Sequence, residues 1–125
     1  MKILIVDDSL LDRKLLMNVL KKAGFENEIL QASNGEEGIK MMYEYMQEIC
    51  LIFLDWQMPN MDGIEVLKLT RNISYVKDIP IIMVTASGSE ANKKVALDAN
   101  PDLAGYVVKP YTASSLIRTV EPYLK

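Results

Sequence analysis

Histidine is absent from this sequence of 125 residues, and cysteine occurs once, as Cys50. Without histidine the chain has neither a His general base nor a His metal ligand, which excludes most catalytic triads and zinc sites. A single cysteine cannot form a disulfide within the chain. Because Cys50 lies beside the strongest apolar run, we expect a buried thiol rather than a reactive one.

The sequence also lacks a long hydrophobic run and a cluster of basic residues. Its first apolar run, residues 3–6, is far too short for a signal peptide or a membrane span. We therefore expect a cytoplasmic protein without membrane insertion. The net charge of -3 would repel the phosphate backbone of a nucleic acid, so we expect protein partners and no nucleic acid.

The chain does have enough apolar sequence for one core. Half of its residues are apolar and a quarter are charged, which is typical of a globular domain. A chain of 125 residues suffices for one domain and is too short for two. Since no linker, repeat or low-complexity stretch is present, we expect a single domain over residues 1–125.

Strand-like and helix-like segments alternate along the chain. Residues 3–6, 51–54 and 79–84 are apolar without alternation, as expected for strands that are covered on both faces of a parallel sheet. Residues 28–32 are more mixed, which indicates an edge strand, and residues 106–108 form the last strand. The pattern predicts a β/α unit repeated five times, with helices on both faces of one sheet.

The segments between the predicted strands have the apolar spacing of helices. These stripes are Leu16, Val19, Leu20 and Ala23; Ile39, Met42, Tyr43 and Met46; and Leu116, Ile117, Val120 and Leu124. Helix starts are indicated by capping pairs, in which a capping side chain precedes a carboxylate by three residues. These pairs are Asn34 with Glu37, Asp62 with Glu65, and Ser87 with Glu90.

Two of the predicted helices carry features that weaken them. The segment 90–99 has only small or scattered apolar residues, so we expect it to be the most weakly docked helix. Pro122 lies near the end of the last helix, where it cannot donate a backbone hydrogen bond and crowds the preceding turn. We expect that helix to kink or to stop early.

Polar side chains follow four of the predicted strands. They are Asp7, Asp8, Asp55, Thr85 and Lys109. Ligands bind at the carboxyl ends of parallel strands where the strand order reverses, so we expect these side chains to meet there. Three close carboxylates raise one another's pKa unless a cation compensates them, and Mg²⁺ prefers such hard oxygen ligands. The set predicts a site for Mg²⁺ and a phosphoryl group.

Each of these residues also has a simpler interpretation. Asp7 and Asp8 could be the acidic first turn of a helix, Asp55 a solvated strand end, and Lys109 a surface charge. However, Pro110 restricts the preceding lysine to extended conformations, so Lys109 should continue its strand toward the site. The conjunction of the residues, rather than any one of them, supports the site.

Four short motifs occur in order along the chain. They are Asp7-Asp8; the segment Asp55-Trp56-Gln57-Met58-Pro59-Asn60-Met61-Asp62-Gly63; Thr85-Ala86; and Tyr106-Val107-Val108-Lys109-Pro110. Together they resemble the receiver domains of two-component response regulators, and the likeness is closest to the single-domain, CheY-like type. The resemblance covers essentially the whole chain. It implies an α/β, flavodoxin-like fold: a doubly wound, five-stranded parallel sheet in the order 2-1-3-4-5 with five helices.

The resemblance also implies roles for the acidic residues. Asp55 would be the phosphoacceptor, taking a phosphoryl group from a phosphohistidine of a histidine kinase or histidine phosphotransfer protein. Asp8 and Asp55 would bind Mg²⁺ directly, the backbone carbonyl of Gln57 would complete the protein ligands, and Asp7 would act through water. The physics fits, since phosphoryl transfer needs mainly positioning and charge neutralisation.

Three further residues would hold the phosphoryl group or respond to it. By the same resemblance, Thr85 and Lys109 would bind phosphoryl oxygens, and Tyr106 would be the aromatic switch that turns inward when Thr85 moves. The protein would then be a phosphorylation-activated switch that binds a downstream protein target. We expect a monomer that catalyses its own phosphorylation and dephosphorylation and turns over no separate substrate.

The sequence departs from the family pattern at three places. Residues 99–106 form a longer connection between the fourth helix and fifth strand than the short Gly-Ala-Asp-Gly-type turn of many members. Pro122 is the second departure. Gln57 and Ser87 are the third, because they flank the acceptor at positions that influence the lifetime of the phosphoryl group in the family.

Three other functions are compatible with parts of the pattern. A flavin-binding electron carrier would need Gly, Ser and Thr after the first strand, where Asp7 and Asp8 would repel the FMN phosphate. A phosphohydrolase with Asp55 as nucleophile usually has a second acid two residues later, where this chain has Gln57. A non-phosphorylated scaffold would not require the complete residue set.

Overall fold

The computed structural model describes residues 1–124 and contains one sheet of five parallel strands. The strands follow the order β2-β1-β3-β4-β5, which confirms the predicted topology, and β2 lies at an edge as its mixed sequence indicated. Their bounds are β1 Lys2–Val6, β2 Glu28–Ala32, β3 Ile49–Leu54, β4 Ile81–Thr85 and β5 Gly105–Val108. The strand order reverses between β1 and β3, so their carboxyl ends form the crevice where ligands bind in such folds.

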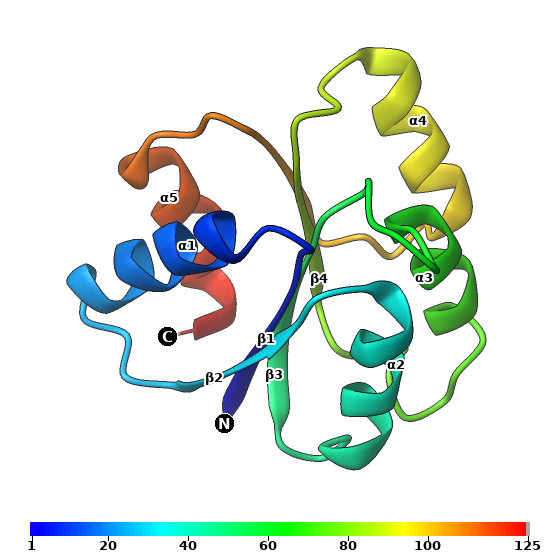
Figure 1. Ribbon diagram of the computed structural model, residues 1–125, viewed down its shortest axis with the longest axis horizontal. Coiled ribbons are helices and arrows are strands. Elements are labelled where there is room, and N and C mark those ends of the chain that lie inside the picture. Colours follow the sequence, from blue (N-terminus) through cyan, green and yellow to red (C-terminus); the bar gives the residue numbers. More distant parts are fainter. Residues whose placement is uncertain (125) are drawn as a thin grey trace.

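Helices cover both faces of the sheet (Figure 1). One face carries α1 and α5, and the other carries α2, α3 and α4. The bounds are α1 Leu10–Lys22, α2 Gly35–Glu44, α3 Gly63–Thr70, α4 Glu90–Ala99 and α5 Ala113–Leu124. None of these helices is both long and apolar enough to cross a membrane, a finding that covers residues 1–124.

The core lies in two layers, one on each side of the sheet. Ile3 and Ile5 pack with Leu16 of α1, whereas Leu4 and Val6 pack in the opposite layer, toward α2 and α3. Successive strand residues point to opposite faces, so a strand covered on both sides is apolar at every position. Each fully buried aliphatic side chain contributes about 1.5–3 kcal/mol to folding.

Two of the three predicted capping pairs are confirmed, and the third is wrong. Asn34 and Asp62 accept hydrogen bonds from the backbone amides of Glu37 and Glu65, respectively. The cap of α4 is Ser89, which accepts from the Asn92 amide, and not Ser87. Ser87 lies in the preceding loop, where other partners engage both its amide and its carbonyl, so the cap lies two residues later than predicted although α4 spans the predicted residues 90–99.

Other boundaries also differ from the prediction, and two of them involve a proline. Strand β4 begins at Ile81 rather than at residue 79, because the amide of Ile79 closes a turn onto Val76 and Pro80 has no amide to donate. Helix α5 continues past Pro122 to Leu124. Since Pro122 lies in the last turn, it removes one hydrogen bond near a helix end and does not stop the helix early.

The connection from α4 to β5 is anchored to α3 by a buried asparagine. Asn100 is 6% exposed, and its side-chain amide faces the Leu67 carbonyl and the Thr70 hydroxyl, each at 3.5 Å. Its side-chain oxygen also accepts from the Asp102 amide at 3.0 Å.

Helix α4 itself buries only two alanines, Ala96 and Ala99. Little apolar side-chain surface therefore holds α4, and its being the most weakly docked helix stays a prediction.

Candidate functional site

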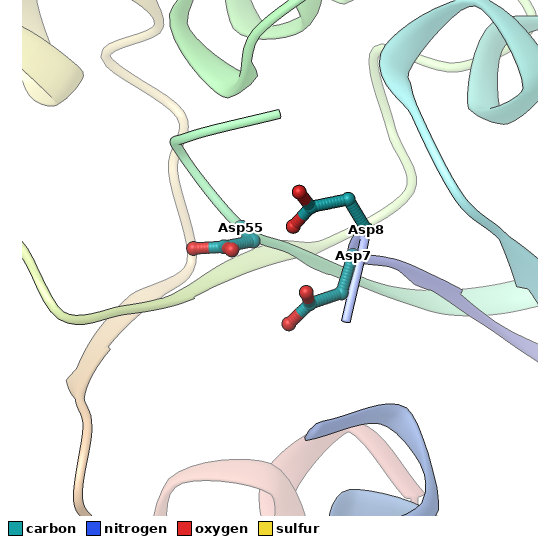
Figure 2. A group of neighbouring side chains, drawn as sticks. All are labelled: Asp7, Asp8 and Asp55. Carbon is teal, nitrogen blue, oxygen red and sulfur yellow. The ribbon is translucent and has the colours of Figure 1, made fainter. Parts of the chain in front are cut away.

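Three carboxylates meet at the carboxyl ends of β1 and β3, as the sequence predicted (Figure 2). Asp7 and Asp8 follow β1, Asp55 follows β3, and ligand oxygens from all three lie within 4.8 Å of one another. The Asp7 amide donates to the Ala32 carbonyl and the Asp55 amide to the Val6 carbonyl, so the sheet itself fixes the two backbones. Asp7 and Asp55 are 5% and 9% exposed, whereas Asp8 is exposed.

Asp55 is a buried acid among charges of both signs. Burial raises its pKa above the ordinary value, the Lys109 ammonium opposes that rise, and the Asp7 carboxylate adds to it. Its Oδ1 atom accepts a hydrogen bond from the Trp56 amide at 2.8 Å. The site therefore disfavours the ionised form of Asp55 relative to an aspartate in water, and a further cation would stabilise that form.

Lys109 lies opposite these carboxylates, at the end of β5. Its backbone amide donates to the Thr85 carbonyl at 2.8 Å, which continues the strand pairing and aims the side chain at the site. The ammonium lies 2.7 Å from Asp7 Oδ2, 2.8 Å from Asp12 Oδ2 and 3.7 Å from Asp55 Oδ2. Burial disfavours the charged amine, but the bonds to Asp12 and Asp7 outweigh it and raise the pKa of Lys109.

Thr85 and Tyr106 are joined through the loop after β4. Thr85 is buried, and its hydroxyl oxygen accepts from the Ser87 amide at 3.3 Å. The Tyr106 hydroxyl donates to the Ser87 carbonyl. Burial raises the pKa of Tyr106, and the negative charge of Asp55 adds to that rise. The two residues that the sequence predicted as the switch are thus linked through Ser87.

The loop after Asp55 forms the rim of the site and is held close by a glycine. Gly63 donates its amide to the Trp56 carbonyl at 2.7 Å. A Cβ atom at Gly63 would lie 2.3 Å from the Asp55 carbonyl oxygen, so only glycine fits this approach. Gln57 is exposed in the same loop, two residues after Asp55, and the use of its backbone carbonyl as a ligand stays a prediction.

Sequence reasoning missed two residues of the site, both on α1. Asp12 bonds Lys109, and the Arg13 guanidinium donates to the Asp7 backbone carbonyl and to the Gln31 side chain. An acidic residue in the first turn of a helix is common, because it interacts favourably with the helix dipole. The sequence therefore carried no signal that Asp12 would face a lysine 97 residues away.

The donor set fits a hard divalent cation. All of its side-chain ligands are carboxylate oxygens, and two of the three carboxylates are buried. The Lys109 ammonium pairs with two of them, Asp7 and Asp55, so the cluster still has more negative than positive charge. Mg²⁺ is held in proteins by one or two carboxylates and keeps several waters. Because Asp8 is exposed, the site is open to solvent next to this residue, and waters on the ion can be accommodated there. A cation beside Asp55 and an amine opposite it can neutralise charge on a phosphoryl group.

Comparison with known proteins agrees with this geometry. The sequence matches the model of the response regulator receiver domain over residues 3–121. It is 36% identical over 124 residues to the chemotaxis protein CheY1 of Helicobacter pylori, which covers 99% of this chain and 97% of that protein. The CheY homolog of Campylobacter jejuni is also 36% identical over 124 residues, covering 99% of this chain and 92% of that protein.

Solved structures show the same fold. The chemotaxis protein CheY4 of Vibrio cholerae superposes with a TM-score of 0.84 at 31% identity, over 98% of each chain. The Mn²⁺-bound form of the response regulator Rcp1 superposes with a TM-score of 0.79 at 27% identity, over 97% of this chain and 89% of the other. This chain belongs to the response regulator receiver domain family and is of the CheY type, acting in phosphorylation-dependent two-component signalling.

Proposed function

We propose that Asp55 is the residue that accepts the phosphoryl group in this receiver, with Mg²⁺ bound beside it. The observation that carries the proposal is the surroundings of Asp55: two carboxylates within 4.8 Å and the Lys109 ammonium at 3.7 Å. An anionic nucleophile accepts a phosphoryl group readily only where positive charge neutralises the incoming oxygens. At Asp55, the Lys109 ammonium supplies one positive charge, and the carboxylates supply ligands for a cation that would bring a second.

The reaction requires in-line attack by an Asp55 carboxylate oxygen on the phosphorus of a phosphohistidine. The new P–O bond forms as the P–N bond breaks, and the departing imidazole nitrogen takes up a proton. Lys109 binds one phosphoryl oxygen as a point charge, and the Thr85 hydroxyl donates to another. The phosphodonor is a histidine kinase or a histidine phosphotransfer protein.

The metal ligands follow from the same cluster. Asp8 and Asp55 would bind Mg²⁺ directly, with the backbone carbonyl of Gln57 as third protein ligand and Asp7 acting through water. When bound, the ion neutralises charge on the transferring phosphoryl oxygens. The Mn²⁺ in the structure of Rcp1 supports a divalent cation in this fold.

The structural effect of phosphorylation is transmitted to the surface through the loop after β4. The Thr85 hydroxyl accepts from the Ser87 amide and still has a proton to donate to a phosphoryl oxygen. A movement of the hydroxyl toward that oxygen lengthens the bond from the Ser87 amide. Ser87 is in turn held by the Tyr106 hydroxyl. The group on Asp55 thereby biases the position of Tyr106 and of the neighbouring α4, where a downstream protein binds.

We extend the proposal to the domain organisation, oligomeric state and location of the protein. The chain acts as a single receiver domain over residues 1–125, is a monomer, and works in the cytoplasm. It catalyses its own phosphorylation and dephosphorylation and has no separate substrate. Membership in the receiver family favours this proposal over the flavin-carrier and phosphohydrolase alternatives.

Intact mass measurement tests the proposal. Incubation with acetyl phosphate and Mg²⁺ should add one phosphoryl group to the native protein, because the site itself supplies positioning and charge neutralisation. Asp55→Asn should gain none, and excess chelator should prevent the reaction. An adduct that persists in the Asn variant, or that forms equally well in chelator, would refute the assignment of Asp55.

A further inference from the structure

We propose that Asp12 is a positioning residue that competes with the phosphoryl group for Lys109. The inference rests on the proposed function, since it concerns the amine that is assigned to the phosphoryl oxygens. Its basis is that the Lys109 ammonium is nearer to Asp12, at 2.8 Å, than to Asp55, at 3.7 Å.

The position of the Lys109 ammonium is the source of the competition. A lysine ammonium has three N–H donors. Two point at short range to Asp7 Oδ2 and Asp12 Oδ2, which leaves one for the direction of Asp55. The third donor is free for a phosphoryl oxygen, but the ammonium lies 3.7 Å from Asp55 Oδ2, and moving it toward Asp55 draws it away from the two short bonds.

Asp12 is the partner that can be released. Asp7 is buried and holds the Ser9 amide with its other oxygen at 2.9 Å, and it belongs to the metal cluster. Asp12 lies outside that cluster, and its side chain is 35% exposed, so water can replace Lys109 at its carboxylate. The Asp12 bond is therefore the one that yields when the amine moves toward a phosphoryl group.

A purely structural role for Asp12 explains the contact less well. Asp12 stands three residues after Ser9, the N-cap of α1, where an acidic side chain often returns a hydrogen bond to the cap amide. Here the Ser9 amide donates to Asp7 instead. The Asp12 carboxylate reaches Lys109, which lies on another element and is largely buried with 17% exposure.

Affinity for beryllofluoride, a mimic of the phosphoryl group on Asp55, tests the competition. We would titrate it into the Mg²⁺-loaded protein and follow Trp56 fluorescence, since the Trp56 amide bonds Asp55. Asp12→Asn should tighten binding up to about fivefold, the amount that a partly exposed ion pair supplies. Asp12→Glu, which keeps the charge, should stay within about twofold of wild type. Glu36→Gln, on the exposed face of α2, should not change the affinity.

A double-mutant cycle separates competition for Lys109 from general charge repulsion. Lys109→Ala alone should weaken beryllofluoride binding, and Asp12→Asn should then have no further effect. If Asp12→Asn tightens binding equally with Ala at position 109, the effect is repulsion and the inference is wrong. If Asp12→Asn leaves affinity unchanged or weakens it while Lys109→Ala weakens it, the inference fails and the proposed function stands. If Lys109→Ala has no effect, the proposed role of Lys109 itself fails.

Discussion

The Tyr106 hydroxyl on β5 donates a hydrogen bond to the backbone carbonyl of Ser87, in the loop that joins β4 to α4. The Ser87 amide donates to the Thr85 hydroxyl oxygen, which lies at the edge of the proposed phosphoryl site. These two bonds form a short path from the site to α4 and β5. Since α4 buries only two alanines, it has little buried apolar surface to lose when it moves.

Beryllofluoride should therefore perturb the backbone NMR signals of residues 87–106 more than those of residues 11–22. Thr85→Ala should reduce this spread, because the hydroxyl that couples the site to Ser87 is missing, while Mg²⁺ binding stays nearly intact. Chemical-shift mapping of both proteins measures the effect. Perturbations confined to the neighbours of Asp55 would show that the phosphoryl site is real and this output surface is wrong.

Mg²⁺ should bind in the absence of phosphate, because its positive charge reduces the repulsion among the three clustered carboxylates. A Mg²⁺ titration followed by Trp56 fluorescence should give a saturable change. Asp8→Ala should weaken the response about tenfold or more, since it removes a ligand. The matched control is Glu36→Ala, which removes an exposed carboxylate on α2. Equal effects of the two substitutions would refute the metal site.

Asp55→Asn should raise the melting temperature by a few degrees in Mg²⁺-free buffer at pH 7. Burial raises the Asp55 pKa in the folded state, so its charge costs stability above the raised pKa. As the pH falls through that value toward the pKa of an unfolded Asp, near 4, the native carboxyl takes up a proton and this cost disappears. The advantage of the Asn variant should therefore shrink on acidification. A variant less stable than wild type at pH 7 would contradict this account.

Gly63→Ala should destabilise the fold by about 1–3 kcal/mol, because the new methyl would overlap the Asp55 carbonyl and force the backbone apart. Denaturant unfolding measures the loss. The same displacement should weaken the Trp56 response to Mg²⁺. Gly24→Ala is the control, since its Cβ would meet no atom within 4 Å and its cost comes only from the positive φ of 93°. It should leave Mg²⁺ binding unchanged, and equal losses of Mg²⁺ binding in both variants would argue against a local effect.

The sequence predicted the sheet well because buried parallel strands are apolar at nearly every position. Boundaries near loops were less predictable. Ser87 and Ser89 both suit an N-cap, and the bonds that hold Ser87 in the loop, a local one to Thr85 and a long-range one to Tyr106, leave Ser89 as the cap. Likewise, Ile79 continues an apolar run in the sequence but folds into a turn before Pro80.

The residues of the candidate site also differ in how well the sequence predicted them. Asp7, Asp8 and Asp55 follow strands, and strand ends are fixed by the sheet, so their meeting could be predicted. Asp12 lies on a helix, and its contact with Lys109 depends on how α1 packs beside the end of β5. No local pattern encodes that packing, so the residue became visible only in the structure.

Mapping the phosphorylated residue tests the central claim most directly. After reaction with acetyl phosphate and Mg²⁺, borohydride would reduce the acyl phosphate to an alcohol, which converts the modified aspartate to homoserine. Mass spectrometry of the peptides should then find homoserine at position 55 and nowhere else, and none after reaction in excess chelator. Homoserine at Asp7, Asp8 or Asp12, or its absence from position 55 in a protein that has gained the phosphoryl mass, would contradict the account.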